Sequence, residues 1–102
     1  MRYVLTGDLF SAKEAFDMGL VSELVPDAEV EKRAVEMAKQ IAELSPLAIQ
    51  QAKEAVLRGM DAALDTGLAL ETKAIQILFS SQDQKEGMAA FIEKRKPKFS
   101  GR

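Results

Sequence analysis

The chain has 102 residues, of which 47% are apolar and 29% charged, with a formal net charge of −2. These proportions are typical of a folded globular domain and argue against disorder, and the length predicts one domain, residues 1–102. The absence of cysteine and histidine excludes disulfides, thiolate chemistry and the commonest general base and metal ligand. With no signal-type stretch and no apolar run near ~18 residues, we expect a cytoplasmic protein without a membrane segment.

The N-terminal part of the sequence predicts short elements. Residues 5–8 have the composition of a turn. Ser11 and Glu14 stand three residues apart in the pattern of a capping box, which predicts a helix over residues 12–18. Gly19 is suited to end that helix, because glycine adopts the left-handed conformation readily.

The middle of the sequence predicts two amphipathic helices. Residues 20–25 are mostly β-branched and apolar, and form either a short strand or an extended segment. Apolar residues recur every three or four positions from 28 to 44, which predicts one helix. Ser45 is suited to cap the next helix and Pro46 to open it, and the apolar face of this helix continues to Gly59.

Two further helices are predicted in the C-terminal part. The first is long, begins at residue 60 or 61, and ends at a polar break over residues 80–83. Asp83 and Glu86 repeat the capping-box spacing and predict the start of the second, so we favour capping over acid–base catalysis for this pair. Pro97 prevents this helix from continuing. Five helices and at most one short strand predict a mainly α fold, a small non-parallel (orthogonal) bundle.

Charge is distributed unevenly along the chain. Residues 85–102 hold six basic and two acidic residues, a net charge of +4, which leaves −6 on the remainder. This basic end is either a solvated surface or a contact for an anionic partner. The isoelectric point of about 5.2 argues against nucleic acid, so an isolated phosphate group is the favoured anion. The residues alone predict no catalytic residue and no metal site.

A resemblance to a known family rests on three collinear stretches. Residues 83–99, Asp-Gln-Lys-Glu-Gly-Met-Ala-Ala-Phe-Ile-Glu-Lys-Arg-Lys-Pro-Lys-Phe, resemble the C-terminal signature of the enoyl-CoA hydratases of the crotonase family. Residues 5–8 with 11–21, and residues 45–48 with 52–53, resemble two upstream segments of that family in the same order. The resemblance covers essentially the whole chain and implies a C-terminal helical domain of such a hydratase.

The resemblance implies an activity that belongs to a larger protein. Members of the family resemble one another in a core of repeated strand–strand–helix turns. This core supplies a backbone oxyanion hole and, in hydratases, two glutamates. These groups precede the segment that residues 5–8 resemble, so we expect no catalytic residue in this chain and no activity of the chain alone. The complete protein is expected to be a lyase of fatty acid metabolism, which hydrates trans-2-enoyl-CoA to 3-hydroxyacyl-CoA. Its substrate is a CoA thioester, and no tightly bound cofactor is expected.

The site that the resemblance implies consists of Lys94 and Phe91. In the family, a lysine of the last helix reaches the nucleotide end of CoA, often in a neighbouring subunit, and by motif position this lysine is Lys94. Phe91 lies one turn earlier and faces the same way, with core packing as its alternative role. The adenine-side aromatic of some members corresponds to residues 74–75, Ala-Ile, where this sequence departs from the family.

The helical region of the family also makes much of its trimer contact, so the resemblance implies a homo-oligomer. Two alternatives remain at this point. The chain is either a non-enzymatic oligomerisation or docking module, or part of a crotonase-fold enoyl-CoA isomerase.

Overall fold

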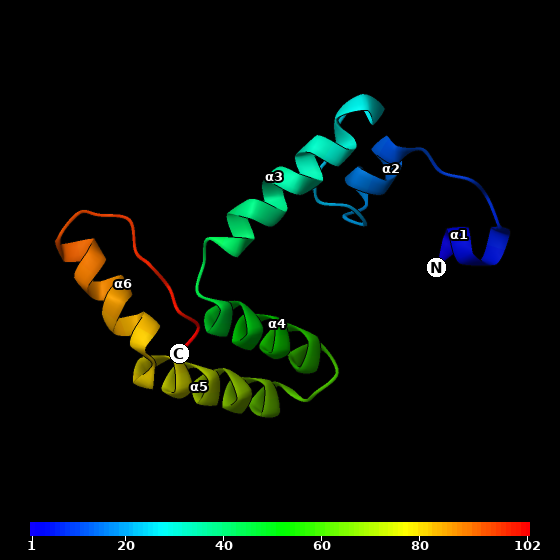
Figure 1. The fold of residues 1–102 in the computed structure, drawn as a ribbon. Coiled ribbons are helices and arrows are strands. Elements are labelled where there is room, and N and C mark those ends of the chain that lie inside the picture. The colour runs from blue at the N-terminus through cyan, green and yellow to red at the C-terminus, as the bar shows by residue number, and fades with distance from the viewer. The chain divides into compact units, whose positions relative to one another are not determined.

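The computed structural model describes residues 1–102 and contains six α-helices, one 3₁₀ turn and no strand (Figure 1). The mainly α class is therefore confirmed, and residues 20–25 form an extended segment outside any strand. The chain divides into two compact units, residues 1–36 and 37–102. None of the helices has the length and apolar composition that crossing a membrane requires.

The first unit begins with a helix that the sequence pattern did not predict. Helix α1 spans Arg2–Thr6 and ends at Gly7, whose φ of 70° lets its N–H donate to the carbonyl of Tyr3. Residues 5 and 6 of the predicted turn therefore belong to α1. The structure has six helices, where the sequence predicts about five. The ring of Tyr3 lies 4.9 Å from that of Phe10, a contact that a five-residue helix needs because it is too short to be stable alone.

Helix α2 spans Ala12–Asp17, which has the predicted start and ends one residue before the predicted end. The hydroxyl of Ser11 accepts from the backbone N–H of Glu14, and the carboxylate of Glu14 accepts from the N–H of Ser11 at 2.8 Å. This reciprocal pair is the predicted capping box. Gly19 has a φ of 75° and follows the helix end, as predicted.

Helix α3 spans Val30–Ala42 and follows the 3₁₀ turn η1, Asp27–Glu29. The first half of α3 belongs to the first unit, where Arg33 binds Glu23 at 2.6 Å. This ion pair ties the extended segment to the helix.

The second unit contains α4, Pro46–Met60, and α5, Leu64–Ser80. Ser45 caps α4 by accepting from the N–H of Ala48, as predicted. The predicted start of α5 at residue 60 or 61 is wrong, because α4 continues to Met60 and the backbone of Ala63 is extended before α5 begins. Helix α5 packs against α4 and then against the last helix.

Helix α6 spans Gln82–Ile92. Its N-cap is Ser81, whose hydroxyl accepts from the N–H of Gln84 at 3.1 Å. The prediction that Asp83 and Glu86 form a capping box is therefore wrong, because Asp83 lies one residue inside the helix, where its side chain has other partners.

Burial within the chain is slight. Ala15 and Ala90 are the only buried apolar residues, whereas Ser45, Ser81 and Asp83 are buried polar residues. Four methionines are also exposed within this chain: Met18, Met37, Met60 and Met88. The helices thus leave their apolar faces uncovered by the rest of the chain.

Candidate functional site

The basic end of the chain forms a C-terminal strap, which we define as residues 94–102. The strap leaves the end of α6 and returns along that helix to its first residues (Figure 1). There, the carbonyl of Arg102 accepts from the N–H groups of Gln82 and Asp83, at 2.6 and 3.0 Å. The ring of Phe99 packs over Gly87, 3.6 Å from the place that a Cβ would occupy. The strap is therefore attached to the first half of α6, from Gln82 to Gly87.

Asp83 binds the far end of the strap. Its carboxylate accepts from the N–H of Ser100 at 2.7 Å and from the N–H of Gly101 at 3.0 and 3.2 Å. It also accepts from the hydroxyl of Ser45 at 2.6 Å, which joins the start of α4 to the same group. The Ser45 hydroxyl bond, followed by the bonds from Ser100 and Gly101, lowers the pKa of Asp83 despite the burial of its side chain.

Glu86 binds the near end of the strap, one helical turn after Asp83. Its carboxylate accepts from both terminal nitrogens of Arg95, at 2.5 and 2.9 Å, and from the N–H of Lys98 at 2.8 Å. The bonds from Arg95, then that from Lys98, lower the pKa of Glu86 to about 2. Arg95 also binds Glu93 at 2.5 Å, so its guanidinium is neutralised within the chain.

Lys94 stands between α6 and the strap in a left-handed conformation. Its φ of 54° is the only positive φ outside glycine in the chain. The N–H of Lys94 donates to the carbonyl of Phe91, and that of Arg95 to the carbonyl of Ala90. These two bonds form a Schellman motif, in which this position is usually glycine. The end of α2 is built the same way, with Gly19 at the equivalent place.

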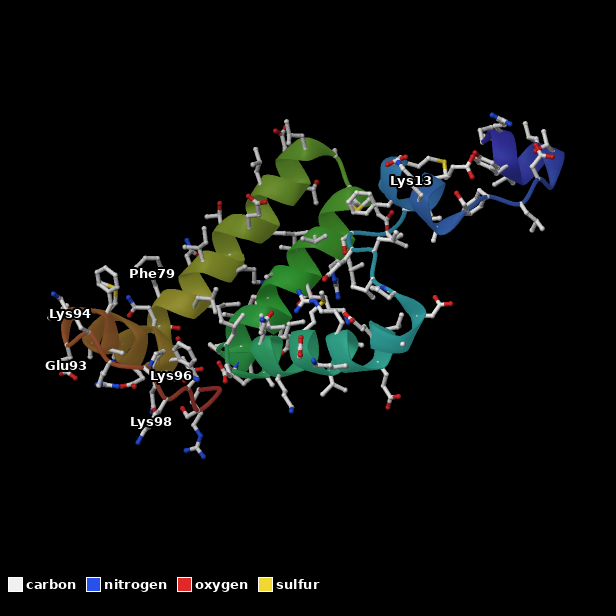
Figure 2. All side chains as sticks on the ribbon, turned by 90° about the horizontal axis from the view of Figure 1, so that it is seen from above. Lys13, Phe79, Glu93, Lys94, Lys96 and Lys98 are labelled. Carbon is white, nitrogen blue, oxygen red and sulfur yellow. The ribbon has the colours of Figure 1, made fainter.

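Some cations of the strap form ion pairs with carboxylates of the chain, and others do not. Lys96 binds Glu43 at 3.0 Å, and Arg95 is held by its two carboxylates. Lys94 and Lys98 make no side-chain ion pair within the chain, and Lys94 extends outward from the end of α6 (Figure 2). The predicted site residue Lys94 is thus an exposed, uncompensated cation.

Phe91, the second predicted site residue, is also on the surface. Its side chain is 81% exposed, so it packs into no core within this chain. Phe91 and Lys94 lie in the same Schellman motif, joined by a backbone hydrogen bond. Phe79, near the end of α5, is a further exposed aromatic (Figure 2). Residues 74–75, the predicted departure from the family, lie on α5 and carry no aromatic ring.

Sequence reasoning did not predict that Asp83 and Glu86 bind the strap. Their spacing matches a local capping motif, so the sequence favours capping for both. Their partners at Ser100 and Lys98 lie 17 and 12 residues away, beyond the reach of any local pattern. The available signal was the opposite charge of the following Lys94-Arg95-Lys96 run.

Comparisons with known proteins place this geometry in a family. The family model of the enoyl-CoA hydratases/isomerases matches residues 1–102. The chain is 44% identical to a probable mitochondrial enoyl-CoA hydratase 2 of Arabidopsis thaliana, covering 96% of the chain and 33% of that relative. It is 39% identical to the 2,3-dehydroadipyl-CoA hydratase of Escherichia coli K12, covering 99% of the chain and 40% of that relative.

A solved structure of an enoyl-CoA hydratase subunit from Geobacillus kaustophilus superposes with a TM-score of 0.92 at 44% identity, over 99% of this chain and 39% of the other. The chain therefore spans about a third to two-fifths of the length of the relatives it matches. The match over all 102 residues and the shared helical fold show that the chain belongs to the enoyl-CoA hydratase/isomerase family.

Proposed function

We propose that this chain is the C-terminal portion of an enoyl-CoA hydratase that contacts CoA and supports oligomerisation. In the complete protein, the reaction is the hydration of trans-2-enoyl-CoA to 3-hydroxyacyl-CoA. The family match over residues 1–102 supports the proposal, as do relatives that carry the hydratase name and are more than twice as long. The contribution of this chain is then binding, and the chemistry resides in the rest of such a protein.

Lys94 is the proposed contact to a phosphate at the nucleotide end of CoA. The observation that carries this role is that Lys94 is exposed and without an ion pair, whereas its neighbours Arg95 and Lys96 are paired. A lysine ammonium is a compact charge that suits phosphate. An exposed pair of this kind is worth up to about 1 kcal/mol and is screened by salt.

Phe91 is the proposed apolar partner at the same place. It projects from the last turn of α6, and its large exposed fraction leaves the ring available to a planar base. Stacking of a base on an aromatic ring contributes about 1–3 kcal/mol. The ring and the ammonium would together recognise a phosphorylated nucleoside.

The carboxylates of the strap region support the view that catalysis lies elsewhere. A general acid in a neutral site needs a raised pKa. Hydrogen bonds shift Asp83 and Glu86 in the opposite direction, the pKa of Glu86 to about 2. Both carboxylates are thus committed to holding the strap, and we propose that the chain alone does not hydrate its substrate.

A purely oligomeric or docking role is the second candidate, because the apolar faces of α3, α4 and α5 are exposed. That role needs no ligand at Lys94. A part of an enoyl-CoA isomerase would share the nucleotide contact, since the two activities differ in groups outside this chain.

The test is an NMR titration of the ¹⁵N-labelled chain with adenosine 3′,5′-bisphosphate, which represents the nucleotide end of CoA. We expect the largest shifts at Phe91, Lys94 and Arg95, and a dissociation constant that rises with salt. Lys94→Ala should weaken binding by about fivefold, the equivalent of roughly 1 kcal/mol. Lys32→Ala removes an exposed, unpaired lysine of α3 and is the matched control. Equal affinities of wild type and Lys94→Ala would contradict the nucleotide contact and favour the purely oligomeric role.

A further inference from the structure

Glu86 contacts the strap on both sides of Pro97. On one side it holds the guanidinium of Arg95 with two hydrogen bonds, and on the other it accepts from the backbone of Lys98. Its side chain is only 26% exposed, whereas the Arg95 side chain that covers it is 39% exposed. The capping role that its sequence position suggests is not the one it performs, and the proposed nucleotide contact does not use it directly.

We propose that Glu86 is a positioning residue for Lys94, which it holds in the left-handed conformation through Arg95. This inference rests on the proposed contact of Lys94 with a phosphate. Glu86 itself touches no ligand. Its effect is to fix the direction in which the Lys94 side chain leaves the end of α6.

The backbone of Lys94 needs such support. A left-handed conformation costs a residue with a Cβ roughly 1–2 kcal/mol, and persists only where neighbouring contacts determine it. The Schellman hydrogen bonds supply part of this support, but at α2 the same bonds are made with glycine. At α6 the added contact is the bidentate pair between Glu86 and the residue that follows Lys94. Two parallel bonds fix the orientation of a guanidinium and not only its distance.

Asp83 provides an internal comparison, because it holds the strap without touching its first residues. Its partners are Ser100 and Gly101 at the far end. If attachment of the strap in general determined the conformation of Lys94, the loss of either carboxylate would disturb it. If Glu86 acts locally through Arg95, only its loss would do so.

The first experiment measures the conformation of Lys94 in the ligand-free chain. A positive φ brings the amide proton close to Hα, which gives a strong intraresidue nuclear Overhauser effect. We expect this signal at Lys94 in wild type, and its intensity to fall by at least half in Glu86→Gln. Arg95→Lys is the second variant, because it keeps the charge and loses the bidentate geometry, and it should show the same fall with little risk to folding.

Two control variants should leave the Lys94 signal unchanged. Asp83→Asn releases the far end of the strap, and Glu31→Gln removes an exposed carboxylate of α3 that makes no ion pair. An undiminished signal in both Glu86→Gln and Arg95→Lys would overturn the inference. A loss of the signal in Asp83→Asn equal to that in Glu86→Gln would also overturn it, because the effect would then belong to strap attachment in general.

The second experiment links conformation to binding in a double-mutant cycle. Glu86→Gln should weaken binding of adenosine 3′,5′-bisphosphate by up to about fivefold, the full loss expected for Lys94→Ala. In the Lys94→Ala background the same substitution should have no further effect. Additive losses would overturn the positioning role. A different outcome would separate the two proposals. If Lys94→Ala binds the nucleotide as tightly as wild type, while Glu86→Gln and Arg95→Lys still lose the Lys94 signal, the proposed function is contradicted. The effect of Glu86 on the conformation of Lys94 is then still supported.

Discussion

Lys94 and Gly19 end two helices of this chain with the same backbone hydrogen bonds. Glycine takes this conformation without penalty because it has no Cβ, whereas lysine is strained there. Glycine would therefore be the more stabilising residue at position 94. A strained residue with an exposed, unpaired charge fits a role for its side chain in binding and not in folding.

Lys94→Gly is accordingly expected to stabilise the chain while weakening nucleotide binding. The relief of left-handed strain exceeds the backbone entropy that glycine adds to the unfolded state, so the free energy of unfolding should rise by about 0.5–1 kcal/mol. Urea denaturation followed by circular dichroism measures this change. Lys94→Ala is the control, since it removes the same charge and keeps the Cβ. A Lys94→Gly chain no more stable than Lys94→Ala would show that the position is unstrained.

At the scale of single residues, sequence motifs and structure supply different information. The C-terminal signature pointed to Lys94 and Phe91, but it could not show that Lys94 is left-handed and unpaired. The roles of Asp83 and Glu86 depend on residues that return to α6 only after the turn at Pro97. Local spacing favours a capping role for this pair. In the structure, both carboxylates instead form long-range hydrogen bonds with the strap.

At the scale of elements, α6 and the strap form a unit held by two carboxylates. The native state lowers the pKa of both carboxylates, those of Asp83 and Glu86. The pKa of Glu86 falls from 4.5 to about 2. Protonation therefore opposes the attached state. The stabilisation from Glu86 is complete above about pH 4.5 and is lost as the pH falls toward 2. The charged groups facing Glu86 are Arg95 and Lys98.

Hydrogen exchange of the Lys98 amide tests this pH dependence. After correction for the intrinsic exchange rate, its protection should be constant from pH 7 to about pH 5 and decline from about pH 4.5 toward 2. In Glu86→Gln the protection should be low at every pH, because the amide side chain cannot ionise. The amide of Leu20, which donates to Ala15 in the other unit, is the internal reference. Constant protection of Lys98 down to pH 2 would contradict the role of the Glu86 charge.

Gly67 provides a second prediction at this scale. It lies inside α5, where a Cβ would stand 3.7 Å from Cα of Gly59, an ordinary van der Waals distance. Gly67→Ala should therefore raise the free energy of unfolding by about 1 kcal/mol, the difference in helix propensity. Gly101→Ala is the contrasting variant and should be destabilising, because φ is 78° there. A destabilising Gly67→Ala would indicate that α4 and α5 pack more closely than this distance implies.

The elements themselves were largely predictable from sequence. Periodicity located α3 to α6, the caps at Ser11 and Ser45 are present as predicted, and the Ser11 cap has its predicted partner, Glu14. Helix α1 was not predicted because five residues are too few to establish a helical period. The start of α5 was placed too early because nothing at Asp61 distinguishes the end of one helix from the start of the next.

At the scale of the whole molecule, apolar side chains are exposed well beyond what a folded monomer usually shows. Leu64, Leu68 and Ile75 of α5 are at least half exposed, as is Val56 of α4. Contiguous apolar surface of this kind marks interaction surfaces. At about 25 cal/mol per Å² of buried apolar area, covering a few hundred Å² contributes several kcal/mol.

We therefore predict that the isolated chain self-associates. Sedimentation equilibrium should give a mass above the 11.2 kDa of one chain, rising with concentration. Leu68→Glu places a charge on the exposed apolar face and should shift the equilibrium toward monomer, whereas Lys32→Ala should leave it unchanged. A concentration-independent monomer mass would contradict a role of these faces in association.

We propose that this chain contributes binding and not chemistry, and the most direct test is the hydration of crotonyl-CoA by the purified 102-residue chain. Loss of the absorbance of the enoyl thioester measures the reaction. We predict no turnover above the uncatalysed rate. Turnover that survives repurification and falls when a carboxylate of the chain, such as Glu86, is replaced by its amide would contradict the claim and place acid–base chemistry among these helices.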